Sequence, residues 1–319
     1  MTRDRRHILY DLGEDQYSLK GIWLLALLFF GSLISGAVLS LIAFKITHFV
    51  DPDASSYLAS KPYPKFFDRA RWVSVLFLLP YLFVKCRITS FRAIGFAKPF
   101  AATFGLWFVS GIAMIFIIYG FNTATGAFAI NPEWSAGLLL KKADDAILAA
   151  LLIGTLEEIV FRGLVFRMFY TAMKPLPALL CSSFFFALLH FKTPEFALGH
   201  LAPSEIGAAQ AAQIAFGTAV AVFTEFDLKY LLAIFLVGVA LHQVFLLGRN
   251  LWASIAIHAG WVFTIKLFGS AFVTTDQASS FSGTTRVADG YWVSMVLVVF
   301  IAGFALLLKR KEGLSRETP

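Results

Sequence analysis

The chain has 319 residues, of which 58% are hydrophobic and 15% are charged, and its mean hydropathy is +0.74. Soluble domains carry about 25% charged residues, so this composition excludes a soluble enzyme, a disordered chain and a collagen, and indicates an integral membrane protein. The net charge of +7 does not indicate a nucleic-acid partner, because the basic residues lie in short clusters between apolar runs. With only Cys86 and Cys181 present, neither a disulfide framework nor a CxxC metal site is available.

Apolar stretches near the ~20 residues that a bilayer demands recur along the chain. We predict membrane spans over residues 21–45, 70–85, 101–122, 143–170, 177–194, 229–248, 251–270 and 291–309. The expected fold is therefore all-α, a polytopic transmembrane helical bundle of about eight spans in the lipid bilayer.

The positive charges predict how this bundle is oriented, because basic clusters stay on the cytoplasmic side. Eight spans keep both termini in the cytoplasm, with the clusters Arg3, Arg5, Arg6 and Lys309, Arg310, Lys311. The uncharged segment 206–224 is a further candidate span, but a ninth span would move the C-terminal cluster to the outer side. We therefore expect 206–224 to be an interfacial or re-entrant insertion.

Ionisable residues inside apolar helices are the informative ones, because a charge near the bilayer centre costs at least ~2.5 to 3.5 kcal/mol. Two adjacent carboxylates, Glu157 and Glu158, precede Arg162 in an otherwise apolar run. Glu158 and Arg162 are four residues apart and can pair on one helix face, whereas Glu157 points about 100° away. Glu157 is thus the candidate general base. The alternatives are that both glutamates only anchor neighbouring helices, or that they form a proton relay in a transporter.

Two histidines, His190 and His258, follow on later apolar helices. With Glu157 they make a convergent set in the bundle interior that could hold a water or a metal ion. His242 and Asn250 are weaker candidates, which we expect to bridge helices. His200 lies in a predicted loop and is expected to be solvated.

Three short motifs occupy these positions. Glu157–Arg162 is an EExxxR motif, Phe186 and His190 are the ends of an FxxxH motif, and a third motif begins at His258. In this order, each inside its own apolar helix, they resemble over residues 148–268 the CPBP family, the CAAX protease and bacteriocin-processing intramembrane endopeptidases, also called the Abi family. The resemblance implies a four-helix catalytic core, a bacterial inner-membrane location and hydrolysis of a peptide bond in a membrane-associated protein or peptide.

The resemblance also implies roles for the motif residues. Glu157 would activate the attacking water with help from His190, and His258 would donate to the oxyanion of the tetrahedral intermediate. Glu158 and Arg162 would hold their helix in register, with Phe186 in support. No cofactor is expected. The alternative is a catalytic zinc ion with the three ligands Glu157, His190 and His258.

The expected organisation has three parts. Residues 1–142 form a cytoplasmic arm and three transmembrane helices, and residues 143–270 form the catalytic core. Residues 271–319 form an outer loop, the last span and a basic cytoplasmic tail.

One position departs from the family pattern. The HxxxN motif would place asparagine where this chain has Val262, and losing one oxyanion donor typically costs ~10²- to 10³-fold in rate. Either another donor takes over, with the Trp261 indole N–H and Asn250 as candidates, or this chain is slow or inactive. The alternatives to a protease are a non-catalytic scaffold or bacteriocin-immunity protein and a proton-coupled transporter.

Overall fold

The computed structural model describes residues 20–85, 90–98, 101–190, 198 and 201–317. Arg3, Arg5, Arg6, Cys86 and His200, which the sequence singled out, lie outside these residues. Within the described part the chain is α-helical apart from one two-stranded sheet, as the composition predicts for an all-α membrane protein. The helices belong to two compact units.

The first unit comprises Ser90–Ala187 and Asp227–Pro319. Its elements in chain order are η1 (Arg92–Ile94), α4 (Ala101–Ala124), β1 (Phe128–Ile130), α5 (Ala136–Glu158), η2 (Ile159–Val165), α6 (Phe166–Ala172), α7 (Pro175–Leu188), α9 (Leu228–Gly248), α10 (Leu251–Phe268), η4 (Gly269–Ala271), β2 (Phe272–Thr274) and α11 (Tyr291–Glu317). This unit therefore contains the Glu157–Arg162 motif, Phe186 and His258.

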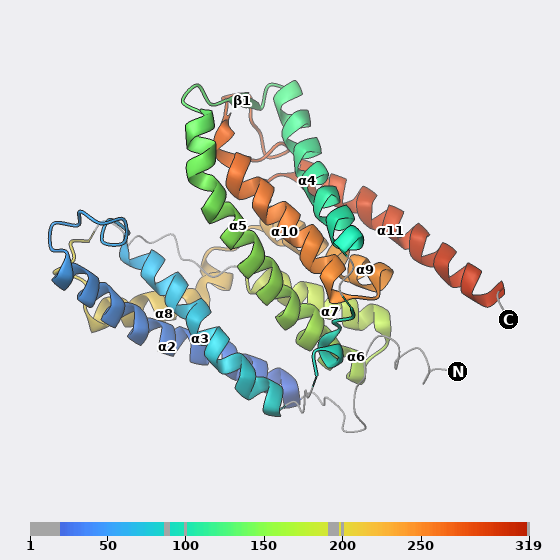
Figure 1. Ribbon diagram of the computed structural model, residues 1–319, viewed down its shortest axis with the longest axis horizontal. Helices are drawn as coiled ribbons and strands as arrows, with labels where there is room; N and C mark the ends of the chain where they lie inside the picture. Colours follow the sequence, from blue (N-terminus) through green and yellow to red (C-terminus); the bar gives the residue numbers. More distant parts are fainter. Residues whose placement is uncertain (1–19, 86–89, 99–100, 191–197, 199–200, 318–319) are drawn as a thin grey trace. The chain divides into compact units, whose positions relative to one another are not determined.

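Helix α10 is the central element of the first unit and packs against α4, α5 and α9 (Figure 1). Small residues bring the backbones together, as is usual between membrane helices. A Cβ atom on Gly111 of α4 would overlap the carbonyl oxygen of Ile257, and one on Gly154 of α5 would lie 3.2 Å from the backbone nitrogen of Ala259. His258 lies between Ile257 and Ala259, in a turn of α10 that closely approaches the backbones of α4 and α5.

A short antiparallel sheet joins β1 and β2, with Ala129 opposite Val273. The backbone N–H of Asn131 donates to the carbonyl of Ala271 (2.8 Å), and that of Thr275 donates to the carbonyl of Ala127 (3.0 Å), which extends the pairing at both ends. The all-α expectation did not include this sheet. It forms because the segment after α4 and the segment after α10 come together only in the folded chain.

The second unit comprises Tyr17–Thr89 and Leu188–Phe226, with helices α2 (Lys20–Val50), α3 (Tyr63–Lys85) and α8 (Ala208–Thr224). Helix α2 packs against both α3 and α8. The Ser40 and Tyr63 hydroxyls are 2.9 Å apart between α2 and α3. The segment 206–224, which we expected to be an insertion, contains helix α8, and this helix packs on α2. The position of α8 relative to the membrane remains a prediction.

Among the described residues, five helices are long and apolar enough to cross a membrane, namely Trp23–Val50, Ala101–Ala124, Leu228–Gly248, Leu251–Ala271 and Tyr291–Arg310. The remaining expected spans differ for visible reasons. Helix α3 includes the charged residues Asp68, Arg69 and Arg71, and α7 has only 14 residues where we expected 177–194. The chain is an integral membrane helical protein, and the count of eight spans stays a prediction.

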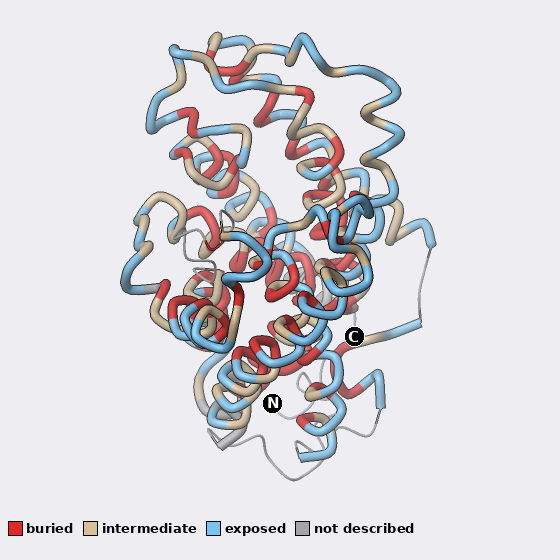
Figure 2. Tube along the Cα trace, turned by 90° about the vertical axis from the view of Figure 1, so that its left-hand side faces the viewer, coloured by how far each residue is buried: buried red, intermediate tan, exposed pale blue. Residues whose placement is uncertain are grey.

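Apolar side chains face outward along these helices. Figure 2 shows buried and exposed positions interspersed along the helices, and the exposed residues include Phe49 of α2, 86% exposed, and Val299 of α11, 71% exposed. Soluble proteins rarely leave large apolar surfaces uncovered. These faces are the surfaces that lipid covers in a membrane.

Candidate active site

The carboxylates of the first motif lie at the end of one helix and the start of a different kind of helix. Helix α5 begins after Ser135, whose hydroxyl accepts from the backbone N–H of Leu138 (3.3 Å), and ends at Glu158. The chain then continues as the π-helix η2, which contains Arg162, and as α6. Short π-helical segments are rare and occur frequently at functional sites. Apolar periodicity predicts one continuous span over 143–170 and carries no signal for this widened turn.

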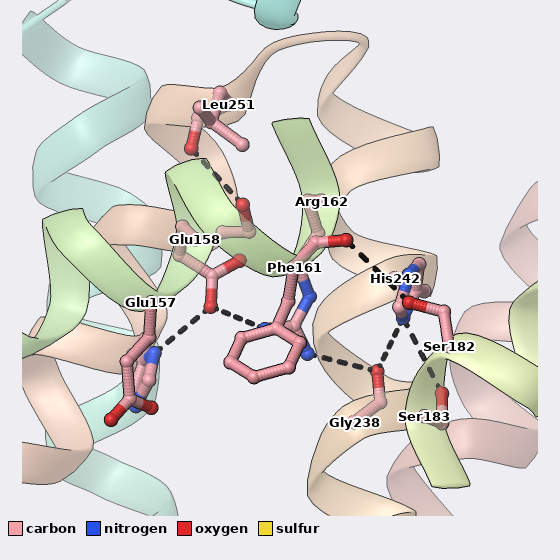
Figure 3. A network of polar contacts seen from close by, with 11 residues as sticks. Glu157, Glu158, Phe161, Arg162, Ser182, Ser183, Gly238, His242 and Leu251 are labelled. Atoms are coloured by element: carbon pink, nitrogen blue, oxygen red, sulfur yellow. Dashed lines mark hydrogen bonds and ion pairs between the residues drawn. The ribbon is translucent and has the colours of Figure 1, made fainter. Parts of the chain in front are cut away.

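Glu158 is held from two directions. Its Oε1 atom accepts hydrogen bonds from Nη1 of Arg162 at 2.8 Å and from Nδ1 of His258 at 2.9 Å. Figure 3 shows this network, in which the side chains of Glu158 and Arg162 are both fully buried. The predicted pairing of Glu158 with Arg162 is therefore confirmed. Nη2 of Arg162 also donates to the carbonyl of Gly238 at 3.2 Å, so the ion pair links α5, η2, α9 and α10.

The bond to Glu158 determines how the His258 ring is used. A carboxylate only accepts, so Nδ1 carries the proton in this contact. Nε2 faces the other way and lies 4.0 Å from Oε2 of Glu157. In the neutral ring Nε2 is an acceptor, and in the imidazolium it is a donor. Glu157 and His258 thus face each other with their side chains 5% and 8% exposed, less enclosed than the ion pair behind them.

Phe186 covers this arrangement from α7. Its ring lies under the guanidinium of Arg162, with 4.8 Å from Cζ to the ring centroid. Its centroid is 6.5 Å from that of His258 and 4.7 Å from that of Phe161, to which it is nearly perpendicular. An aromatic cover excludes water, and charges interact more strongly where water is excluded.

His190 was expected to close the fifth span, but it lies in a turn two residues beyond the end of α7. The ring is half-buried, and the residue belongs to the second unit. The first unit by itself therefore brings together five of the expected site residues: Glu157, Glu158, Arg162, Phe186 and His258. The part of His190 in activating water stays a prediction.

A second polar cluster extends from Gly238 and includes the weaker candidate His242. Nδ1 of His242 lies 2.8 Å from the carbonyl of Gly238 and 3.4 Å from the hydroxyl of Ser183. The hydroxyl of Ser182 donates to the carbonyl of Phe161 at 3.5 Å. His242 thus bridges α9 and α7, as expected for a structural residue.

Sequence reasoning missed two polar features inside the first unit. Gly238 contributes a main-chain oxygen, which no side-chain pattern reveals. Arg167 of α6 is fully buried. A second arginine five residues after Arg162 in an apolar run was a signal that could have found it.

The alternative zinc site that the sequence offers has the ligands Glu157, His190 and His258. Among the described residues, no three side chains of His, Cys, Asp or Glu come together as a metal site requires. Glu157 and His258 belong to the first unit and His190 to the second, so zinc dependence stays a prediction. By themselves, Glu157 and His258 can transfer protons and form hydrogen bonds.

The segment that carries this site is similar to a known protein family. Residues 141–264 match the family model described as Type II CAAX prenyl endopeptidase Rce1-like. No curated protein and no solved structure matches the chain. The matched segment begins within α5 and ends within α10, so it contains every motif residue that the sequence singled out.

Proposed function

Because residues 141–264 form an Rce1-like domain of the type II CAAX prenyl endopeptidase family, we propose that the chain is an intramembrane endopeptidase that uses a glutamate-activated water. The observation that supports this most directly is the pair Glu157 and His258, 4.0 Å apart, with the His258 ring fixed from behind by Glu158. This spacing fits hydrolysis, because Glu157 would act on the attacking water and His258 on the carbonyl oxygen. Both of these oxygen atoms become bonded to the same carbon atom.

In the proposed reaction, Glu157 accepts a proton from water as the water oxygen bonds to the peptide carbonyl carbon. His258, protonated at Nε2, donates a hydrogen bond to the oxyanion that forms. The proton on Glu157 then passes to the leaving nitrogen as the carbon–nitrogen bond breaks. His190 assists Glu157 with the water. Glu158 and Arg162 take no proton in this scheme, and they hold the His258 ring in place.

The proposed substrate is a membrane-associated protein or peptide that is cleaved near its C-terminus. The site lies on helices of an integral membrane protein, and Glu157 and His258 are almost fully buried, so a substrate must bring its scissile bond to the interior of the helical unit. A segment anchored in the same bilayer is already concentrated at the surface of these helices. The proposal requires no metal ion for any of its steps.

We further propose that the protein lies in a bacterial inner membrane with both termini in the cytoplasm. The support for a cytoplasmic C-terminus is the basic cluster Lys309 to Lys311 at the end of the last candidate span, Tyr291–Arg310. A C-terminal epitope tag should be cut by added protease in inverted vesicles and protected in right-side-out vesicles. The reverse pattern would contradict this topology.

The test of the enzyme function is cleavage of a membrane-peptide library in liposomes, with prenylated and unprenylated C-termini side by side. Glu157→Gln keeps the size of the side chain and removes the base, so cleavage should fall by about 10²- to 10⁴-fold. The matched control is Glu133→Gln, at an exposed glutamate in the loop before α5, which should cleave as the wild type does. Equal cleavage by Glu157→Gln and wild type would refute the proposed base.

A scaffold or immunity protein that retains the protease fold is the second candidate. The observation that favours it is Val262, one turn beyond His258, whose side chain cannot donate to an oxyanion. Absence of cleavage by folded wild-type protein across the whole library would support this candidate over the enzyme.

A further inference from the structure

The oxyanion of the proposed reaction needs more than one donor, and His258 supplies one. This inference rests on the proposed function. Oxyanion sites use preorganised donors, and the loss of one costs ~10²- to 10³-fold in rate. Nδ1 of His258 is already engaged with Glu158, so only Nε2 of this ring is available to a substrate. A second donor must come from a neighbouring residue.

The hydroxyl groups of α10 and the amide of its cap residue already have hydrogen-bond partners. The hydroxyl of Ser254 donates to the carbonyl of Leu251 (3.1 Å), and that of Thr264 donates to the carbonyl of Gly260 (2.8 Å). Asn250 is the N-cap of α10. Its Oδ1 atom accepts from the backbone N–H groups of Trp252 and Ala97, and its Nδ2 atom donates to the carbonyl of Lys98 at 3.5 Å. It precedes His258 by eight residues, about 12 Å along a helix at 1.5 Å per residue.

Trp261 has the properties that these residues lack. It follows His258 by three residues, and residues at this spacing are neighbours on a helix surface. The two ring centroids are 6.3 Å apart. The side chain is buried, with 5% exposure, and the buried indole Nε1 has no hydrogen-bond partner among the described residues. A buried N–H group without a partner is costly and calls for an explanation.

We propose that the indole N–H of Trp261 is the second oxyanion donor, acting beside Nε2 of His258 in the site that Glu157 serves. Because the ring is packed inside the helical unit, the N–H group keeps its position without a hydrogen bond to another residue. It therefore needs no reorganisation when charge develops on the substrate oxygen. This assignment makes Trp261 a catalytic residue and accounts for the tolerance of valine at position 262.

Trp261→Phe tests the assignment because it removes the N–H group and keeps an aromatic ring. Since the donor acts on the transition state, kcat should fall by about 10²- to 10³-fold with little change in KM. The matched control is Trp292→Phe at the start of α11. Its indole N–H is also buried without a partner among the described residues, but its ring stacks on Phe121 at 3.8 Å rather than beside His258. This control should retain wild-type kcat.

Rescue separates a lost donor from a disturbed fold. Val262→Asn places an amide donor one turn beyond His258, on the same helix face. In the Trp261→Phe background it should restore most of the lost kcat, whereas a packing defect would remain. In the wild-type background the same substitution should change kcat by less than about tenfold, because the second donor is already present.

The outcomes separate this inference from the proposed function. Wild-type cleavage that Glu157→Gln abolishes, with unchanged kcat in Trp261→Phe, would overturn the donor assignment and leave the protease standing. The assignment is also wrong if Val262→Asn alone raises kcat 10²-fold or more, a result that does not depend on the folding of the tryptophan variant. No cleavage by the wild type overturns both proposals.

Discussion

His258 and His242 lie on neighbouring helices, α10 and α9, and each has its Nδ1 atom within hydrogen-bond distance of an acceptor. The acceptor for His258 is the carboxylate of Glu158, 100 residues away in the chain, and Nε2 faces a second carboxylate, Glu157. The acceptor for His242 is the carbonyl of Gly238, one turn earlier in its own helix.

The two histidines also differ in exposure and in how their rings pack. His258 is 6% exposed, whereas His242 is fully buried and packs against Phe166, with the ring centroids 4.7 Å apart. Two residues of the same type therefore differ in the charge of their partners and in access to a substrate. For a histidine inside a membrane helix, the group that its second ring nitrogen faces therefore distinguishes a chemical role from a structural one.

The largest expected effect comes from Arg162, which joins the two histidine clusters by bonding to both Glu158 and Gly238. Arg162→Met leaves a buried carboxylate without its cation, so the free energy of unfolding should fall by about 3 to 5 kcal/mol. Equilibrium unfolding in detergent micelles measures it. Lys266→Met, at an exposed position of α10, is the control and should change stability by less than about 0.5 kcal/mol. A loss below about 1 kcal/mol for Arg162→Met would mean that His258 alone satisfies Glu158.

The next effect distinguishes the two rings directly. His258→Asn retains an N–H near the position of Nδ1, and thus the contact with Glu158, but it deletes Nε2. We expect kcat to fall by about 10²- to 10³-fold, the cost of one oxyanion donor. Peptide cleavage in liposomes gives kcat and KM. If this variant cleaves at the wild-type rate, Nε2 has no part in the reaction.

A smaller effect is expected where α9 meets α7. A Cβ atom at Gly238 would lie 2.9 Å from Cβ of Ser183, closer than side-chain carbon atoms approach. Gly238→Ala should therefore lower the free energy of unfolding by about 1 to 3 kcal/mol, the usual cost of overpacking. Gly303→Ala in α11 is the control, because nothing lies within 4 Å of its added carbon. If the two variants are equally stable, close packing of Gly238 against Ser183 does not contribute to the stability of the protein.

The smallest effect is expected at His242. His242→Asn retains a donor for the carbonyl of Gly238 and loses the ring contact with Phe166, so stability should fall by about 0.5 to 1.5 kcal/mol. Because the ring takes no part in the proposed reaction, kcat should stay near the wild-type value. A drop in kcat as large as that of His258→Asn would end the distinction between the two histidines.

Much of the cluster around Glu158, Arg162 and His258 could be predicted from the sequence, because its residues break the apolar pattern of their helices. The spacing of Glu158 and Arg162 predicts their pairing, which the 2.8 Å contact confirms. The spacing also predicts that Glu157 points elsewhere. The motifs also predict that Glu157 and His258 converge, and the two side chains lie 4.0 Å apart. Nothing in the pattern indicates that Glu158 bonds to Nδ1 of His258, because that contact joins two helices distant in the chain.

The helix limits were predicted less well, for local reasons. Helix α7 ends at Leu188, six residues before the predicted limit of the span at residue 194. The π-helix Ile159–Val165 consists mostly of apolar residues, as does the α-helix before it. Hydropathy reports whether a side chain prefers lipid or water, and it carries no information on how many residues make one turn.

The sequence by itself determined that this protein is a helical membrane protein, because 58% hydrophobic residues leave no soluble alternative. It also determined the local pairing of Glu158 with Arg162, because a helix brings residues four apart together. Only the tertiary structure decided that the same carboxylate reaches His258 and turns Nε2 toward Glu157. The physical reason is that helix packing through Gly154 and Gly111 sets the distance between α10 and its neighbours, and packing depends on all the contacting surfaces at once.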